Sequence, residues 1–333
     1  MFRFLGTTRA TSTIEGTLKS INNQLKSLFD LDIGLYNDKT IIDLKEQFID
    51  YITQVTKKFP QKYLLICLDS IDQLRNSANI EWILTKLPNK RIKIIYSTLN
   101  NYNQILENLM RKINCESSFL SVTHLNQKDS LKIVENWLRS INRSLSKYQW
   151  NLLQNLFKKA TLYPLYVKII YDIISKWPSF YTPEPKDPFL ECINIDRCIK
   201  YFFGLLELKF GTHLVSRCLF YLTISTNGLS ENELEDILSI DDDLLVNIFQ
   251  YHESPIRRFP ISLWSRIRFD LNEYLTTREL DGSTVIYWYH RKFIETVTNL
   301  YINPLNSRIR DKYYGNIVHY FLGMFILQNS SLK

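Results

Sequence analysis

The chain is poor in the two residue types that interrupt regular structure, since only nine glycines and ten prolines occur among its 333 residues. Few tight turns can form in such a chain, and this favours long helices. Hydrophobic residues make up 45% of the sequence and aromatic residues 14%. That content is enough for a sizeable core in two or three domains and predicts a mostly helical globular protein.

Other features are also missing. The five cysteines are odd in number and show no Cys-x-x-Cys spacing, so the sequence predicts neither a disulfide framework nor a zinc site, and a reducing compartment fits best. No apolar run approaches the roughly 18 to 20 residues that a membrane helix needs, and residues 1–12 contain no signal-peptide core. We therefore expect a cytoplasmic protein without a membrane segment. Although the formal charge is +7, Lys and Arg form no block, so solvated helix faces explain them better than a nucleic-acid site.

The first third of the chain alternates apolar strands with amphipathic helices. Strands are predicted at residues 2–5, 63–68, 91–97 and 119–122, and helices at 14–28 and 41–55. Ser12 and Glu15 have capping-box spacing ahead of the first helix. The run 63–68 is continuously apolar, as in a buried parallel strand. Such α/β alternation predicts a parallel sheet with its ligands at the carboxyl ends of the strands, where Asp69, Ser97 and Thr98 fall.

The rest of the chain follows a helical pattern. We expect helices within 127–176, a Pro-rich linker at 177–188 that forms the main domain boundary, and helices near 198–210, 214–223, 230–238, 241–251 and 263–275. Segments 277–280 and 284–289 flank Asp281-Gly282, a strong hairpin signal. Helices followed by a two-stranded wing predict a winged-helix domain. A further amphipathic helix is expected at 308–327.

The segment Asp69-Ser70-Ile71-Asp72 follows an apolar strand, as a Walker B segment requires. The first carboxylate of such a segment holds Mg²⁺ by way of water, and a second can orient the attacking water. An apolar run ending in Asp is also common where the Asp only caps the next helix. Because a second Asp follows and a later strand ends in Ser97-Thr98, both interpretations stay open.

Five segments, at residues 2–8, 64–74, 94–99, 228–238 and 288–293, resemble successive segments of NACHT-family STAND NTPases in the family's order. Within this family, the segments most resemble those of NACHT-and-WD-repeat proteins. Together they extend over nearly the whole chain. The resemblance implies an α/β region followed by mainly α structure, namely an incomplete P-loop NTPase sheet with helical and winged-helix domains. The implied boundaries are 1–125 for the NTPase core, 126–188 for the helical domain and linker, 189–300 for the winged helix, and 301–333 for a further helical segment.

The resemblance also assigns roles to individual residues. It implies that Asp69 is the magnesium-side acid and Asp72 the second, catalytic acid, although Gln73 stands where many members have Glu. Ser97 and Thr98 match the polar sensor of the family.

Three other positions are implied less directly. Leu99 stands where many relatives have Arg, which weakens the case for phosphate sensing there. Pro164, after Tyr163, matches the proline near adenine, and His290 matches the histidine that contacts the β-phosphate. Pro164 could instead only start a helix, and His290 could be a packed, hydrogen-bonded residue.

A phosphate-binding loop is missing, since none of the nine glycines is followed by Lys. In the resembled fold that loop follows a strand that lies upstream of the element at Met1, between the fourth and fifth strands of the sheet. We therefore expect a fragment, or a chain completed by another polypeptide, with unpaired strand edges and exposed apolar surface. ATP or ADP and Mg²⁺ would bind only if an upstream segment supplied the loop. The chain alone is not expected to be an enzyme, and residues 1–125 alone should aggregate.

Three functions remain open at this stage. The leading hypothesis is a regulatory and oligomerisation scaffold of a signal-transducing NACHT-type ATPase switch, with protein partners or self-association. A winged-helix nucleic-acid-binding protein is the second. Residues 228–251, taken to include the helix that would enter a groove, contain seven acids and no Lys or Arg, which argues against it. The third is an NTPase-derived scaffold without nucleotide chemistry.

Overall fold

The computed structural model describes residues 1–6, 10–31, 40–77, 79–99, 104–182, 184, 187–225, 227–250, 257–280 and 282–323. Some predictions lie outside these residues, and they concern Thr7, Thr8, Pro183, Pro185, Tyr251, Asp281 and the end of the last predicted helix at 324–327. The chain divides into two compact units, Met1–Val122 and Thr123–Lys333. The Pro-rich segment at 177–188 lies within the second unit.

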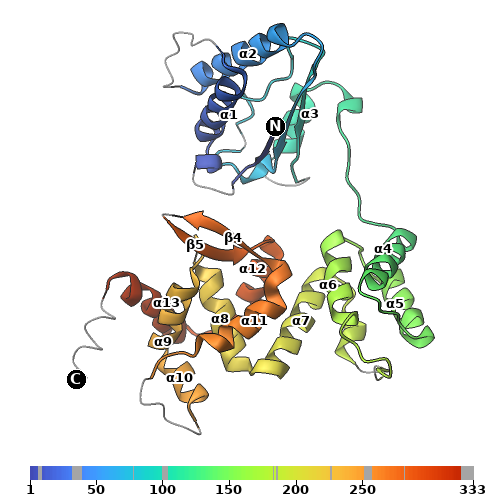
Figure 1. Ribbon diagram of the computed structural model, residues 1–333, viewed down its shortest axis with the longest axis vertical. Helices are drawn as coiled ribbons and strands as arrows, with labels where there is room; N and C mark the ends of the chain where they lie inside the picture. Colours follow the sequence, from blue (N-terminus) through green and yellow to red (C-terminus); the bar gives the residue numbers. More distant parts are fainter. Residues whose placement is uncertain are drawn as a thin grey trace. The chain divides into compact units, whose positions relative to one another are not determined.

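The first unit is a small parallel sheet with helices (Figure 1). Its strands are β1 (Phe2–Phe4), β2 (Leu64–Asp69) and β3 (Ile92–Tyr96), paired in the order β1-β2-β3. Its helices are α1 (Ile14–Phe29), α2 (Ile41–Lys58) and α3 (Ile105–Lys112). Three of the four predicted strands, those at 2–5, 63–68 and 91–97, are confirmed as parallel strands, and both predicted helices are confirmed.

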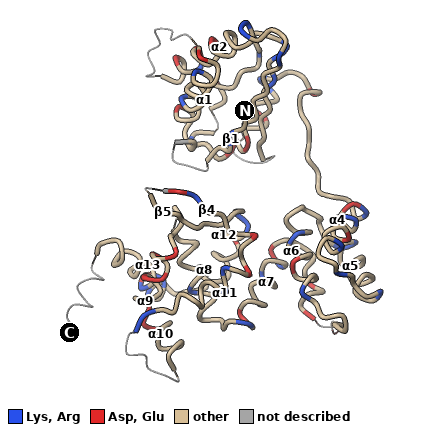
Figure 2. The backbone as a smooth tube through the Cα atoms, in the orientation of Figure 1, with Lys and Arg blue, Asp and Glu red and all other residues tan. Residues whose placement is uncertain are grey.

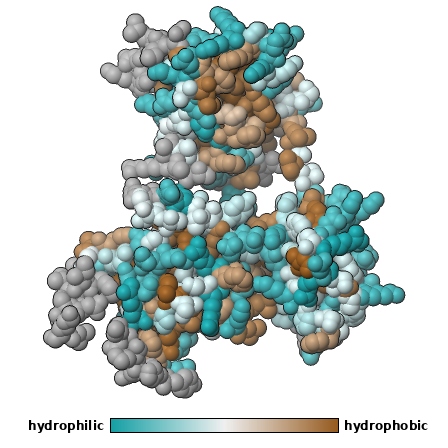
Figure 3. Space-filling view, in the orientation of Figure 1, coloured by the Kyte–Doolittle hydropathy of each residue, from teal (hydrophilic) through white to brown (hydrophobic). Residues whose placement is uncertain are grey.

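Only one face of this sheet is covered. Leu64, Ile66 and Leu68 of β2 are buried in one core with α1 and α2, whereas the alternate residues face outward. Phe2 and Phe4 of β1 are 67% and 63% exposed. Figure 3 shows hydrophobic residues gathered over the strands of this unit. The prediction of a buried parallel strand at 63–68 therefore holds for one face only. The other face is not covered by a described helix, and it presents the exposed apolar surface that was expected.

The predicted strand at 119–122 does not form. Residues 119–122 have no regular structure, and Leu120 and Val122 are about nine-tenths exposed, at 89% and 90%. A β-strand exists only when its backbone groups pair with a neighbour. In the part of the chain that the structure describes, β3 pairs with β2 alone, so this apolar segment does not pair with the open edge of β3.

The start of α1 also differs from the prediction by one residue. The N-cap is Thr13, whose side chain accepts a hydrogen bond from the Gly16 amide, and Ser12 belongs to the preceding 3-10 turn. Helix α2 has a capping box of Thr40 and Asp43 that the sequence analysis did not identify. Both caps satisfy amide groups that a helix leaves unpaired at its first turn.

The second unit is mainly helical and shares one hydrophobic core. Its helices are α4 (Gln127–Ser140), α5 (Lys147–Lys159), α6 (Pro164–Ile174), α7 (Ile195–Phe210), α8 (Thr212–Ile224), α9 (Glu231–Ile240), α10 (Asp242–Ile248), α11 (Ile261–Leu271), α12 (Arg291–Val297) and α13 (Ser307–Phe321). Strands β4 (Leu275–Leu280) and β5 (Ser283–Trp288) form the predicted antiparallel hairpin. The helices predicted in this region are confirmed, with ends that differ by a few residues. No helix among the described residues has the length and apolarity needed to cross a membrane.

Candidate functional site

Asp69 and Ser97 lie together at the carboxyl edge of the parallel sheet. Asp69 ends β2, Ser97 follows β3, and the Ser97 hydroxyl donates a hydrogen bond to Oδ1 of Asp69. The amide of Ser70 donates to the same hydroxyl oxygen over 2.8 Å. Because Ser97 also pairs through its backbone with Leu68 and Ile71, each at 3.0 Å, its side chain is held firmly against the Asp69 carboxylate.

The backbone after Asp69 explains why the carboxylate stays at the edge. Ser70 adopts a left-handed conformation with φ of 62°, and a 3-10 turn over Ile71–Gln73 follows without a side-chain cap. The Asp69 side chain instead accepts its hydrogen bond from Ser97. The alternative interpretation, in which Asp69 caps the following helix, is therefore wrong. The Asp69 side chain is exposed and presents carboxylate oxygen to solvent.

Asp72 occupies a different environment. Its side chain is only 4% exposed, and Oδ2 accepts a hydrogen bond of 2.7 Å from Nε2 of Gln73. Among the described hydrogen bonds, none joins Asp72 to Asp69 or Ser97. The structure thus brings together the first predicted acid and the sensor serine, but not the second acid. Its role in orienting water stays a prediction.

Gly6 fixes the approach of β1 to this turn. Its φ is +73°, and a Cβ added there would lie 2.5 Å from Cβ of Gln73. The amide of Leu5 meanwhile donates to the Asp69 carbonyl over 3.0 Å. Only glycine meets both the positive φ and the close approach.

Thr98 is half-buried, and its hydroxyl lies 3.4 Å from the Leu99 carbonyl, so it does not reach Asp69. The donor set available for a cation at this edge is therefore one carboxylate and one hydroxyl. Mg²⁺ is bound in proteins by one or two carboxylates together with water and substrate phosphates, so the exposed Asp69 carboxylate fits that ion. Among the described residues no group of three His, Cys, Asp or Glu side chains could hold a metal alone.

Pro164 and His290 belong to the second unit. Pro164 is the exposed first residue of α6, where its missing amide hydrogen costs nothing. His290 is the N-cap of α12, and its Nδ1 accepts a hydrogen bond of 3.1 Å from the Lys292 amide. Burial, reinforced by the charge of Arg291, lowers the pKa of His290. The neutral ring then carries its hydrogen on Nε2, which leaves one donor for a ligand. The nucleotide contacts of both residues stay predictions.

The helices and hairpin after α7 have the winged-helix arrangement. Leu229 pairs with Ile286 of β5, and α8, α9 and α11 precede the β4–β5 wing. The helix directly before the wing is α11, whereas the sequence analysis placed the groove helix within 228–251. That assignment is wrong because α9 and α10 are followed by another helix before the hairpin begins. Helix α11 contains Arg266 and Arg268 together with a single acid, Asp270.

Sequence analysis also missed a buried polar network that joins α13 to the winged helix. Asp241 is fully buried and accepts hydrogen bonds from the Tyr221 hydroxyl at 2.8 Å and the Leu244 amide at 3.2 Å. Nε of Arg217 lies 3.3 Å from Oδ2 of Asp241, and Asn316 of α13 donates to Tyr221 over 2.8 Å. Burial raises the pKa of Asp241 despite Tyr221 and Arg217. Within a run of three aspartates, no sequence signal marks the first as buried.

Comparison with known proteins agrees with this architecture. Residues 194–308 match the family described as the NWD1-like, winged helix-turn-helix domain. The second unit therefore contains a winged-helix domain of this kind.

Almost the whole chain is similar to NACHT and WD repeat proteins. It is 28% identical over 325 residues to mouse NACHT and WD repeat domain-containing protein 2, over 332 residues to human NACHT domain- and WD repeat-containing protein 1, and over 327 residues to human NACHT and WD repeat domain-containing protein 2. Each alignment covers 97% of this chain and 18% to 20% of the relative. The chain is thus NACHT-related, and it spans about a fifth of the length of the relatives it matches.

Proposed function

We propose that this chain is a regulatory part of a NACHT-type, nucleotide-controlled signalling switch that works through protein association, and that Asp69 and Ser97 form the magnesium side of its nucleotide site. The observation that carries the proposal is the hydrogen bond between these two side chains at the carboxyl ends of β2 and β3. Ligands of open parallel sheets bind outside this edge. The likeness to NACHT proteins supports the same assignment.

The chemistry assigned to each residue follows from the geometry. Asp69 would hold Mg²⁺ through its exposed carboxylate, and Ser97 would orient that carboxylate by donating to it. The bound Mg²⁺ would neutralise phosphate charge. The 333 residues contain no Gly-Lys pair, so backbone amides and an ammonium for the phosphates must come from another segment. The chain alone should therefore not bind ATP.

Calorimetry tests this proposal with two proteins. The 333-residue chain should show no binding of Mg-ATP. A fusion that adds, ahead of Met1, the strand and phosphate loop of a related NACHT protein should bind it at micromolar concentration. Asp69→Asn in the fusion should weaken binding by about tenfold or more, while Asp311→Asn, an exposed acid on α13, should not. Micromolar binding by the unfused chain, or binding indifferent to Asp69→Asn, would contradict the proposal.

Nucleic-acid binding is the second candidate, because α11 occupies the position before the wing and contains Arg266 and Arg268. The charge of the domain weighs against it. Residues 194–308 contain twelve basic and fifteen acidic residues, and Figure 2 shows the two signs interspersed along the chain. Arg268 is also paired with Glu231. A salt-dependent gel shift with duplex DNA would decide, since phosphate contacts weaken steeply with salt.

A further inference from the structure

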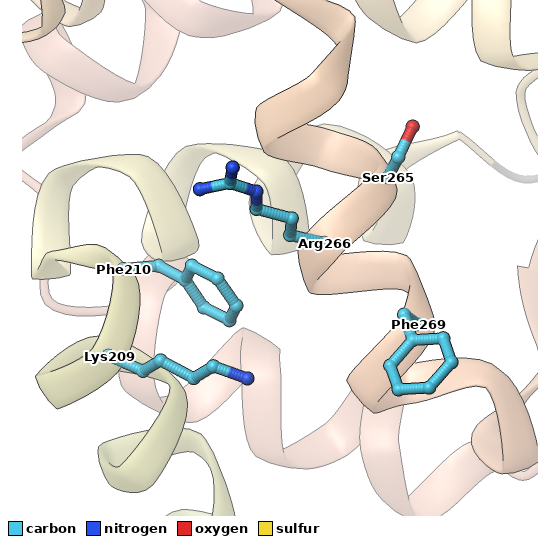
Figure 4. A pocket seen from close by; sticks show the side chains of 5 residues that line it. All are labelled: Lys209, Phe210, Ser265, Arg266 and Phe269. Carbon is cyan, nitrogen blue, oxygen red and sulfur yellow. The ribbon is translucent and has the colours of Figure 1, made fainter.

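A pocket of about 520 Å³ opens between the end of α7 and the outer face of α11. Lys209 and Phe210 line it from α7, and Ser265, Arg266 and Phe269 line it from α11. Figure 4 shows that Phe210 and Arg266 point toward each other from the two helices, with Lys209 below them and Phe269 at the far end. The site lies wholly within the second unit and takes no part in the nucleotide chemistry proposed above.

The pocket keeps a positive charge. In the part of the chain that the structure describes, Arg266 forms no ion pair, unlike its neighbour Arg268. Lys209 contacts Asp270 at 2.7 Å, but Asp270 also binds Lys176 at 3.0 Å. One carboxylate therefore faces two ammonium groups, and Arg266 adds a third cation. A ligand group that completes this arrangement must be anionic.

The pocket also presents aromatic surface that the fold does not use. Phe269 is 81% exposed, which leaves most of a large apolar side chain in water. Phe210, on α7 across the pocket, is half-buried, and the Lys209 ammonium lies 4.9 Å from the centre of its ring. Arginine and aromatic side chains at the centre of a concave patch are the composition typical of protein-binding hot spots.

Two other ligand classes fit less well. A small molecule would be enclosed by its pocket, whereas Phe269 projects from the surface. A polyanion such as DNA would meet the acidic excess of residues 194–308 and the carboxylate of Asp270 within the patch. A single carboxylate on a protein segment avoids both difficulties, because it needs only the local cations.

We propose that this pocket docks a short acidic protein segment. One carboxylate of the segment lies between Lys209 and Arg266, and an adjacent aliphatic or aromatic side chain packs on Phe210 and Phe269.

Selection from a random heptapeptide phage library on the full 333-residue chain tests the proposal, with subtraction on an Arg266→Glu, Phe269→Ser double variant. Enriched peptides should combine Asp or Glu with a large apolar residue. Fluorescence anisotropy of the labelled consensus peptide should show affinity about tenfold or more weaker in each single variant, and weaker still at high salt. Both substituted side chains are exposed, so the thermal unfolding midpoint should stay unchanged.

Matched control variants distinguish binding at this pocket from non-specific binding to exposed side chains. Phe180→Ser removes another aromatic side chain that is 83% exposed, and Arg308→Glu reverses another exposed arginine. Neither should change the peptide affinity. The proposal is overturned if no peptide is enriched, if the consensus lacks acids, or if Arg266→Glu leaves its affinity intact. An oligo(dT) probe that displaces the peptide and binds more tightly through Arg266 would also overturn it, in favour of nucleic acid.

Discussion

Substitution of Asp270 by Asn should lower the unfolding free energy of the second unit by an amount that depends on pH. Asp270 on α11 accepts from Lys176, just after α6, and from Lys209 at the end of α7. Its side chain is 7% exposed, while both lysines are about 60% exposed. One buried carboxylate thus joins three helices of the second unit.

The size of the effect follows from this mixed exposure. Hydrogen bonds to charged groups contribute roughly 1.5–3 kcal/mol when buried, but exposed ion pairs contribute only about 0.2–1 kcal/mol. Asn keeps an acceptor and loses the charge, so we expect a loss of about 1–2 kcal/mol. For a unit of this size, that corresponds to a midpoint roughly 3–6 °C lower.

The sign of the pH dependence follows from the pKa of Asp270. Burial alone would raise it, but the hydrogen bonds and charges of Lys209 and Lys176 outweigh burial and lower it. A lowered pKa in the folded state stabilises the fold above the pKa of the unfolded chain, and this contribution is lost as pH falls through the folded value. The difference in unfolding free energy between the wild type and Asp270→Asn should therefore be largest at pH 7 and should disappear in acid.

Scanning calorimetry of the full chain from neutral to acidic pH measures this difference. Asp311→Asn removes the same charge from an exposed site on α13 and should change stability by less than about 0.5 kcal/mol. A stability difference that persists in acid, or no difference at pH 7, would refute the conclusion that the ionised Asp270 carboxylate stabilises the contacts with Lys176 and Lys209.

Three other substitutions probe single contacts. Arg217→Met leaves the fully buried Asp241 without its cation and should cost about 3–5 kcal/mol in urea unfolding; a loss below about 1 kcal/mol would contradict this pairing. His290→Ala should cost about 1 kcal/mol through the lost cap of α12, and His290→Asn should restore it if capping is the structural role. Gly6→Ala should destabilise the first unit by at least about 1 kcal/mol, because its φ is positive and the new Cβ meets Gln73, so unchanged thermal unfolding of that unit would show that β1 can shift.

Helix positions could be predicted from sequence because their signals are local. Ser146 with Gln149, and Ser230 with Glu233, form capping boxes at the three-residue spacing typical of that motif. Each needs only residues within one turn, so no tertiary contact can move it. The one-residue error at Thr13 arose where two hydroxyl residues lie side by side and either could cap.

Strand predictions failed where pairing decides the outcome. The apolar segment 119–122 has the composition of a strand, but composition cannot supply a neighbour. The candidate nucleotide site shows the same contrast between what sequence spacing predicts and what tertiary contacts decide. Asp69 and Ser97 were expected together because parallel strands end at one edge, and they are hydrogen-bonded. Asp72 is buried within the 3-10 turn that Gly6 approaches closely, and no spacing rule predicts that burial.

Separating α6 from α7 would cost much free energy. This cost limits the conformational change that a nucleotide could drive. Trp177, after α6, meets Phe189 edge to face with ring centroids 4.7 Å apart, and Phe189 packs on Tyr201 of α7 at 5.8 Å. Trp177 and Phe189 are 6% and 0% exposed. Exposing two such rings, at about 150–250 Å² each and about 25 cal/mol per Å², costs about 8–12 kcal/mol. Allosteric coupling energies are typically about 1–3 kcal/mol, so we expect the nucleotide-driven change proposed above to leave α6 and α7 packed together.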